Sequence, residues 1–395
     1  MELDAFSWLL TPEGQALLER AEELIGSQTD TLRAHDLLRR DAPSAHVAAA
    51  LTQAELRRRA VSKFGELAAR MYFTPDGLEQ ATRLPVARHR AARLAAYGAP
   101  SLIDLGCGIG GDLIAAAEAG ITAAGVDLDP ERVAVAGANL ATLGLPGAVT
   151  VADATAVDHT GFAVAYADPA RRGAGGRVFS ADDWAPPWSF VETLLRRVAC
   201  VKVAPGIPHE LVPPGVEAEW VSDHGEVKEA ALWSGGLATT ARRATVIGDG
   251  GLATLTDADA PPAAELGPAG LGDYLYEPDG AVIRAGLVTG VAASLDGVLL
   301  DEHLAYVGTD TAARTPYATG YRVVDRLPYR EKQLRAALRE RDIGALTIKK
   351  RGVDVVPEQL RKRLALRGSR AATIVLTRVD GQGTCLLVER IDRTT

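Results

Sequence analysis

Residues Ser101 to Asp129, SLIDLGCGIGGDLIAAAEAGITAAGVDLD, decide the fold class of the chain. A short apolar run, a cluster of glycines, an alanine-rich stretch and a second apolar run ending at Asp127 follow one another. This order predicts a strand, a glycine-rich turn, a helix and a second, parallel strand. Glycines at such a turn let backbone amides approach a ligand, and the start of the helix points towards it. The stretch therefore predicts a ligand site at the edge of a parallel sheet.

Two ligands fit these glycines. The pattern Gly106-x-Gly108-x-x-Gly111 matches the fingerprint of dinucleotide-binding turns, whereas Asp104-x-Gly106-x-Gly108-x-Gly110 matches the loop that binds S-adenosylmethionine. Asp104 separates the two, because its negative charge would repel the pyrophosphate of a dinucleotide but would suit the amino group and sulfonium of S-adenosylmethionine. We therefore expect S-adenosylmethionine as the cofactor.

Acids also end the next three predicted strands, TAAGVD, AVTVAD and FAVAYAD. Asp127 can accept hydrogen bonds from ribose hydroxyls, and Asp153 can accept one from an adenine amino group. The fourth strand ends in Asp168-Pro169-Ala170-Arg171-Arg172. Because ligands of such sheets bind at the carboxyl ends of the strands, the four acids predict one site.

From Asp104 to Asp168 the chain resembles the core of the class I S-adenosylmethionine-dependent methyltransferases. The resemblance implies that the glycine loop cradles the methionine part of the cofactor, that Asp127 contacts its ribose and that Asp153 contacts its adenine. It also implies a Rossmann-like α/β core. The residues expected to hold the methionine part are Asp104, Gly106, Gly108 and Gly110.

The Asp168 motif predicts where catalysis takes place. In relatives that methylate nitrogens the motif is usually Asp/Asn-Pro-Pro-aromatic, so the Asp-Pro-Ala-Arg-Arg sequence departs from it. We expect Asp168, with Pro169 beside it, to orient a nucleophilic nitrogen or accept its proton, and Arg171 to hold a phosphate or carboxylate. The role of Arg172 stays open, and the apolar flanks of Cys200 favour a buried structural thiol over a nucleophile.

Composition limits the remaining function classes. The chain has 395 residues, 47% of them hydrophobic, so it can form two or three domains with sizeable cores. Its three cysteines lie far apart, which argues against disulfides and a cysteine metal site. No apolar stretch of about 18 to 20 residues suggests a membrane span, and the first residues lack a secretory pattern. We therefore expect a cytoplasmic protein that binds neither metal nor membrane.

Helix-capping motifs and changes in composition along the chain predict four parts. Thr11-Pro12, the Thr52-x-x-Glu55 capping box and Thr74-Pro75 predict helix starts in an N-terminal helical domain. Beyond the methyltransferase core the chain becomes rich in Gly, Ala, Pro and Asp, and then reads as helix, strand, helix and a strand pair. The expected parts are a helical domain at 1–96, the core at 97–250, a linker and connecting segment at 251–320, and an α+β domain at 321–395.

The C-terminal part is basic, although the whole chain carries a net charge of −8. From Tyr321 to Arg370 there are 15 Lys and Arg against six acids, a net charge of +9. Together with GALTIKKRGVDVVPEQLRKRL and the segment Met71–Thr82, this part resembles the bacterial methyltransferases that end in a THUMP-like domain, which implies RNA as substrate. The expected RNA contacts are Lys349, Lys350, Arg351, Arg361, Lys362 and Arg363, with Tyr329 as a nearby aromatic residue.

The sequence thus favours methylation of a base nitrogen in tRNA or rRNA, delivered by the basic domain. Two alternatives stay open at this point. One is a methyltransferase of a small molecule or protein in which the basic domain only caps the fold. The other is an RNA-binding protein that keeps the methyltransferase fold without catalysis.

Overall fold

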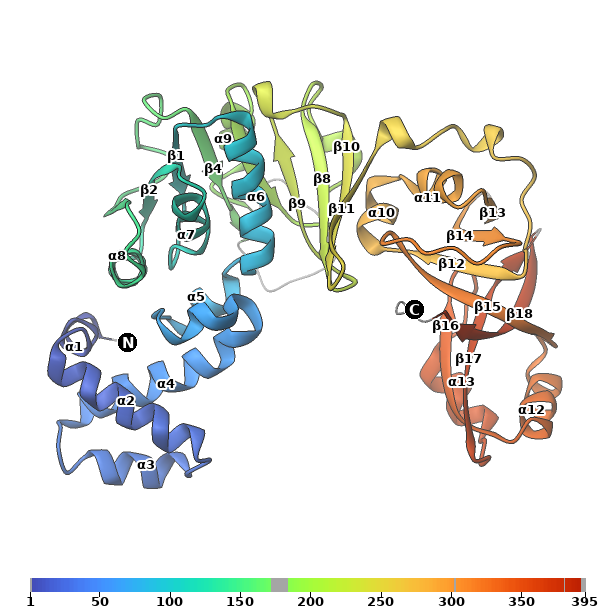
Figure 1. Cartoon of the computed structure of the whole chain (residues 1–395), viewed down its shortest axis with the longest axis horizontal. Coiled ribbons are helices and arrows are strands. Elements are labelled where there is room, and N and C mark those ends of the chain that lie inside the picture. The colour runs from blue at the N-terminus through green and yellow to red at the C-terminus, as the bar shows by residue number, and fades with distance from the viewer. Residues whose placement is uncertain (1, 172–183, 302, 380, 392–395) are drawn as a thin grey trace. The chain divides into compact units, whose positions relative to one another are not determined.

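A computed structural model describes residues 2–171, 184–301, 303–379 and 381–391 (Figure 1). The chain divides into two compact units. The first contains Met1–Val216 and Ala231–Thr239, and the second contains Glu217–Ala230 and Thr240–Thr395. No helix in the described ranges is both long and apolar enough to cross a membrane.

The first unit begins with helices, as predicted. They are α1 (Leu3–Leu9), α2 (Pro12–Gly26), α3 (Thr31–Leu38), α4 (Ser44–Phe64), the 3₁₀ turn η1 (Gly65–Ala69), α5 (Pro75–Gln80) and α6 (Leu84–Tyr97). The caps at Thr11 and Thr74 are confirmed, since each side chain accepts a hydrogen bond from the backbone N–H three residues on. Gly98, in the left-handed region with φ of 82°, ends α6.

The predicted capping box at Thr52 and Glu55 is wrong. Both residues lie inside α4, which begins at Ser44 directly after Pro43. The residues before Thr52 are mostly alanine and include the buried Val47 and Ala50, so the helix continues through them. A capping motif marks a helix start only where the preceding residue leaves the helical conformation.

A parallel sheet follows in the first unit, with the order β3-β2-β1-β4-β7. Its strands are β1 (Ser101–Leu105), β2 (Thr122–Asp127), β3 (Ala148–Val151), β4 (Val164–Ala167) and β7 (Ala199–Val203). The connecting helices are α7 (Gly111–Glu118) between β1 and β2, α8 (Pro130–Leu143) between β2 and β3, and α9 (Trp188–Leu194) before β7. Two short strands, β5 (Ala170–Arg171) and β6 (Trp184–Ala185), form a separate pair, and η3 (His209–Leu211) follows β7.

The strand order continues from β7 through β9, β8 and β10 to β11. The strand β9 (Glu226–Trp233) contributes residues to both units, and η4 (Gly235–Leu237) follows it. In the second unit, β8 (Glu217–Asp223) is parallel to β10 (Arg242–Gly248), which is antiparallel to β11 (Gly251–Thr256). The alternating β and α order confirms the predicted α/β class.

The second unit also contains a seven-stranded sheet with the order β13-β14-β12-β15-β18-β17-β16. The predicted helix–strand–helix–hairpin order at its end is confirmed by α12 (Glu331–Glu340), β16 (Ile343–Lys350), α13 (Pro357–Leu364), β17 (Arg370–Val379) and β18 (Gln382–Arg390). One face of this part packs against α12 and α13 through Leu334, Leu338, Leu360, Leu364, Ile348, Leu376 and Cys385. The other face packs on Tyr306, Tyr321, Val375 and Leu386.

The segment 251–320, where a linker is expected, is largely folded. After β11 it holds the turns η5 (Asp257–Asp259) and η6 (Ala263–Glu265), then β12 (Tyr274–Pro278), α10 (Gly280–Ala285), α11 (Val288–Ser294), β13 (Val298–Asp301), β14 (Leu304–Thr309) and the start of β15 (Ala318–Leu327). Its strand β12 pairs with β15 of the basic segment. Short strands between glycines and prolines carry little periodicity, which is why composition alone indicates a linker. The four-part division of the chain stays a prediction.

Two buried amides, one from α4 and one from α8, hold the segment at Tyr72 and Phe73. Gln53 of α4 accepts from the N–H of Phe73 at 3.0 Å and donates to its carbonyl at 2.6 Å. Asn139 of α8 accepts from the N–H of Tyr72 at 2.6 Å and donates to the carbonyls of Tyr72 and Ile109 at 3.0 and 2.9 Å. Because Ile109 belongs to the glycine loop, one side chain joins that loop to the helical segment.

Replacing Asn139 with leucine should therefore destabilise the first unit. The change leaves the N–H of Tyr72 without its buried acceptor, which costs about 1 to 3 kcal/mol. The melting temperature should fall by several degrees in thermal unfolding followed by circular dichroism. Thr142→Ala, at an exposed position of the same helix, provides a control that should melt as the natural protein does. An unchanged melting temperature in Asn139→Leu would contradict the fastening role.

Candidate active site

The glycine loop follows β1 and opens α7, as predicted. Gly106, Gly108 and Gly110 have φ values of 118°, 54° and 84°, in the region that favours glycine. The N–H groups of Gly106 and Cys107 donate to the carbonyl of Val126 at 2.9 and 2.8 Å. A Cβ on Gly110 would lie 3.2 Å from the Cβ of Ala136, so glycine lets the loop approach α8 closely.

Asp127 ends β2 beside this loop. One of its carboxylate oxygens accepts from the N–H of Gly108 at 3.0 Å, and the other accepts from the N–H of Asp129 at 2.9 Å. These bonds fix the direction of the carboxylate. Each oxygen has a second lone pair, so the predicted bonds from ribose hydroxyls can be added to the existing ones.

Asp104 of β1 is almost fully buried, with 1% of its surface exposed. Its Oδ1 atom has no hydrogen-bond partner in the described part of the chain. Burial raises the pKa of Asp104 well above its usual value, the negative charges of Asp112 and Asp168 raise it further, and the cation of Arg90 opposes them. An unbonded carboxylate oxygen among other carboxylates fits a cationic ligand group, and S-adenosylmethionine supplies an ammonium and a sulfonium.

A network that the sequence analysis missed surrounds Asp104. The buried Arg90 of α6 pairs with Asp112 in the first turn of α7 and lies 4.5 Å from the ring centre of Tyr166. Asp112 also accepts from the hydroxyls of Thr82 at 3.0 Å and Tyr166 at 3.3 Å. These residues come from four separate segments, so no local motif joins them. The signal present in the sequence is that Arg90 falls on the same face of α6 as Val86, Ala87 and Leu94, where a buried arginine requires an acid.

Asp168 follows β4 and forms an ion pair with Lys202 of β7. The Lys202 Nζ atom lies 2.6 Å from Asp168 Oδ2 and also donates to Thr82 Oγ1 at 3.3 Å. The two side chains are 33% and 17% exposed, so the pair is accessible from one side. The parallel register, in which Ala167 lies opposite Val201, brings Asp168 next to Lys202.

The other predicted residues of the core lie as follows. Pro169 is buried directly after Asp168. Arg171 belongs to β5, and Arg172 lies outside the described residues. Asp153 follows β3 and is exposed, and its carboxylate accepts from the N–H and hydroxyl of Thr155 at 2.8 and 2.7 Å, which lowers its pKa. Cys200 is fully buried in β7, which agrees with a structural thiol.

The six predicted RNA contacts divide into two groups. Lys349 pairs with Glu277 at 2.5 Å; burial lowers its pKa, but the hydrogen bond and charge of Glu277 raise it more. Arg351 lies 5.5 Å from the ring centre of Tyr306. The remaining residues are exposed, although Arg361 donates to the carbonyl of Leu346 and Arg363 pairs with Glu331 at 2.8 Å. The exposed contacts are Lys350, Arg361, Lys362 and Arg363.

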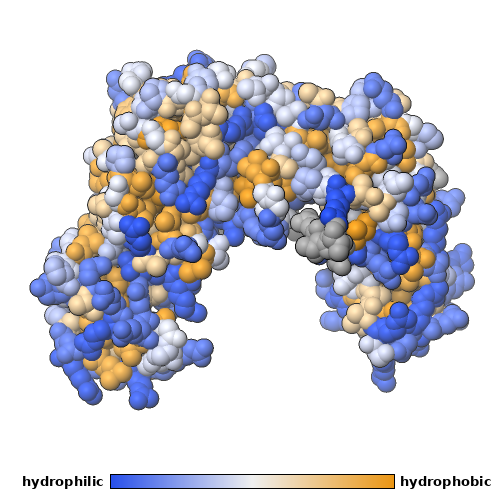
Figure 2. Space-filling model, viewed as in Figure 1, coloured by the Kyte–Doolittle hydropathy of each residue, from blue (hydrophilic) through white to orange (hydrophobic). Residues whose placement is uncertain are grey.

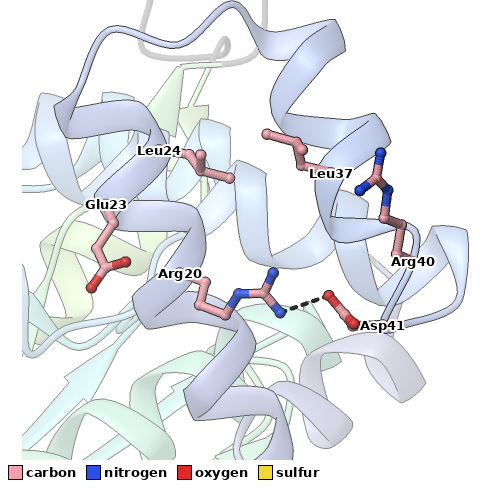
Figure 3. Close-up of a pocket in the computed structure, with 6 residues that line it drawn as sticks. All are labelled: Arg20, Glu23, Leu24, Leu37, Arg40 and Asp41. Atoms are coloured by element: carbon pink, nitrogen blue, oxygen red, sulfur yellow. Dashed lines mark hydrogen bonds and ion pairs between the residues drawn. The ribbon is translucent and has the colours of Figure 1, made fainter.

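A separate groove of about 330 Å³ lies among the N-terminal helices, between α2 and α3 (Figure 3). An ion pair of 2.7 Å joins Arg20 to Asp41 across it, and both side chains are half exposed. Leu24 and Leu37 line the same groove. None of the strand-end acids lines it.

The chain is similar to proteins of known sequence and structure. The chain is 41% identical over 337 residues to an uncharacterized S-adenosylmethionine-dependent methyltransferase of Mycobacterium tuberculosis, found in strains CDC 1551 / Oshkosh and H37Rv. The match covers 82% of this chain and 90% of the relative. Residues 318–390 match the family model "THUMP domain-like", and residues 2–60 match a domain of unknown function, DUF8688.

A solved structure shares the fold. The crystal structure of a "putative methyltransferase" from Porphyromonas gingivalis W83 aligns with a TM-score of 0.74 and 19% identity. The alignment covers 96% of this chain and 99% of that one. The similarity at this identity concerns the fold, which extends over the helical part, the sheet and the C-terminal domain.

Replacing Asp104 with asparagine should separate ligand binding from stability. The variant should bind S-adenosylmethionine about 10- to 100-fold more weakly in calorimetry, since one charge-assisted bond contributes about 1.5 to 3 kcal/mol. Without ligand it should be more stable than the natural protein. The raised pKa means that the folded state holds a proton which the unfolded state releases above about pH 4, so the natural protein loses stability as the pH rises.

The gain in melting temperature of Asp104→Asn should accordingly grow from acid towards neutral pH. Thermal unfolding at a series of pH values measures it. The exposed Asp36 provides a matched control, because Asp36→Asn should change neither ligand affinity nor this pH dependence. Equal affinity in Asp104→Asn and the natural protein would remove Asp104 from the cofactor site.

Proposed function

The chain belongs to the family of S-adenosylmethionine-dependent methyltransferases, and we propose that it methylates a base nitrogen of tRNA or rRNA, docked through its basic C-terminal domain. The observation that carries the proposal is the Asp168–Lys202 pair beside Asp104 at the carboxyl edge of the sheet. The cofactor supplies a methyl group on a positively charged sulfur. The protein therefore has to align a nucleophile with that methyl group and accept a proton.

Asp168 suits the second task. Its Oδ2 atom accepts from Lys202, which leaves Oδ1 for the N–H of a base amine. The hydrogen bond would direct the nitrogen lone pair towards the cofactor, and the carboxylate or the solvent would take the proton that the methylated nitrogen releases. Lys202 holds the carboxylate from one side, and Thr82 in turn accepts a hydrogen bond from Lys202. Pro169 restricts the backbone directly after it.

The cofactor-facing residues would remain in place during this step. The glycine loop, Asp104 and Asp127 would surround the methionine part and the ribose. The exposed carboxylate of Asp153 would contact the adenine of the bound cofactor. These assignments rest on the order of the strand ends, β3-β2-β1-β4-β7, which matches the order of Asp153, Asp127, Asp104, Asp168 and Lys202.

Two observations support RNA as the substrate. The match to the THUMP-like model covers 318–390, and the segment 321–370 within it has a net charge of +9. The visible surface over α12 is largely hydrophilic (Figure 2). Cationic side chains on such a surface bind phosphates without regard to sequence, which is how a docking domain contributes affinity.

The decisive experiment compares modified nucleosides. Total RNA from a deletion strain, from the parent and from a strain with the gene restored would be digested and quantified by mass spectrometry. The proposal predicts one methylated base that is absent in the deletion and returns on restoration. If every methylated nucleoside is unchanged while the purified protein still binds S-adenosylmethionine, a small molecule or a protein becomes the substrate.

Variants of Asp168 and Lys202 test the chemistry on the RNA so identified. Asp168→Ala should lower kcat at least 100-fold, because it removes the proton acceptor, and should leave cofactor affinity nearly unchanged. Lys202→Met should lower kcat less and leave KM for the cofactor unchanged, and Lys202→Arg should recover part of the loss, as expected of a positioning residue. Turnover of Asp168→Ala at the natural rate would refute the assignment, and equal rates for Lys202→Met and Lys202→Arg would reduce Lys202 to a structural role.

A further inference from the structure

We propose that one end of the C-terminal sheet binds unpaired nucleotides of RNA along a row formed by Lys350, Arg378 and Tyr329, with Gly383 beneath the tyrosine ring. The row rests on the proposed RNA substrate and names the surface that would hold it. Its residues are up to 54 positions apart in the sequence, from Tyr329 to Gly383. The sheet order β15-β18-β17-β16 brings them together (Figure 1).

Strand register places the residues in line. Arg378 of β17 lies directly opposite Gly383 of β18, so their side chains share one face of the sheet. Continuing the β15–β18 register beyond Leu327 and Cys385 brings Tyr329 beside Gly383. On the other side of β17, Lys350 lies opposite Leu376, one pleat before Arg378. Adjacent strands are about 4.8 Å apart, so the row spans roughly 14 Å, enough for about two or three nucleotides.

All of these positions belong to the face that α12 and α13 cover elsewhere. Lys350 comes two residues after Ile348, and Arg378 two residues after Leu376, both of which pack against these helices. Gly383 comes two residues before Cys385 of the same core. The row continues this face past the helices, where Lys350, Arg378 and Tyr329 are exposed.

The two cations of the row are available to a ligand. Neither Lys350 nor Arg378 forms an ion pair or hydrogen bond through its side chain within the described residues. By contrast, Lys349 points to the opposite face and pairs with Glu277. Neighbouring cations without acidic partners are complementary to the phosphates of a nucleic acid strand.

The tyrosine supplies a stacking surface. Tyr329 is 39% exposed, and its ring lies against Gly383, where an added Cβ would be 3.1 Å from the ring carbons Cε1 and Cζ. Glycine at this position therefore lets the ring rest on the sheet. An exposed aromatic ring beside cations is how proteins bind unpaired bases, because every base has a π face that can stack. Duplex RNA would not offer such a base.

The test measures binding of full-length protein to a short unstructured oligoribonucleotide by fluorescence anisotropy. Tyr329→Ala should weaken binding roughly 5- to 100-fold with the salt dependence unchanged, because it removes stacking. Tyr329→Phe should bind as the natural protein does. Lys350→Gln and Arg378→Gln should each reduce the slope of log affinity against log salt by about 0.7, because each removes one phosphate contact.

Matched controls come from outside the row. Tyr97 is 44% exposed and also lies against a glycine, Gly236, but belongs to the first unit, so Tyr97→Ala should leave binding unchanged. Arg326 is exposed on the opposite face of the same sheet, since it pairs in register with Leu386, and Arg326→Gln should preserve the salt slope. Gly383→Val, which displaces the ring without removing it, should weaken binding as Tyr329→Ala does.

The outcomes separate the row from the proposed function. If Tyr329→Ala binds the oligoribonucleotide as tightly as the natural protein does, the proposed row is overturned. The proposal of an RNA substrate is then unaffected. A second outcome is that the protein binds an RNA duplex as tightly as the oligoribonucleotide, with the variants losing the same affinity for both. That result would overturn the proposal that the row binds unpaired nucleotides. Absence of binding to the oligoribonucleotide, to a duplex and to tRNA would overturn both the row and the RNA substrate.

Discussion

The candidate site depends on the burial of Asp104 with one carboxylate oxygen unbonded. Asp112, Asp168 and Asp127 all raise its pKa, and Arg90 is the cation that opposes them. An excess of acids is unfavourable in the empty protein, because each charge has been taken out of water. The same excess favours a ligand that brings positive charge. The cost in stability at the sheet edge would be offset when a cationic cofactor binds there.

The N-terminal helices take part in this arrangement, because they supply residues to the site itself. Arg90 of α6 neutralises Asp112, and Thr82, just before α6, joins Asp112 to Lys202. Asn139 then connects the segment at Tyr72 with the glycine loop at Ile109. One cluster of buried residues that pack against one another includes both Phe6 and Leu237. Removing the helical part would therefore disturb the cofactor loop as well as the surface.

The sequence was sufficient to predict those features that follow from the regular geometry of a parallel sheet. Acids at the ends of successive strands meet at one edge, so Asp104, Asp127, Asp153 and Asp168 could be grouped without coordinates. Sequence reasoning did not find Arg90, Asp112 or Thr82, because their contacts join α6, the loop before α6 and the first turn of α7, which no spacing rule connects. It also misplaced the start of α4, since the Thr52–Glu55 motif lies within a stretch that is helical on both sides.

The basic domain shows why net charge is a poor guide to a binding surface. Alternate residues of a strand point to opposite faces, so the consecutive cations Lys349, Lys350 and Arg351 do not act together. Lys349 balances Glu277, and Arg351 lies over Tyr306 on the same side, whereas Lys350 points to the face of α12 and α13. Arg322 is similarly engaged by Glu389, which like Glu277 lies outside the segment 321–370. The charge that remains available to a polyanion is therefore smaller than +9, and its position follows from strand register.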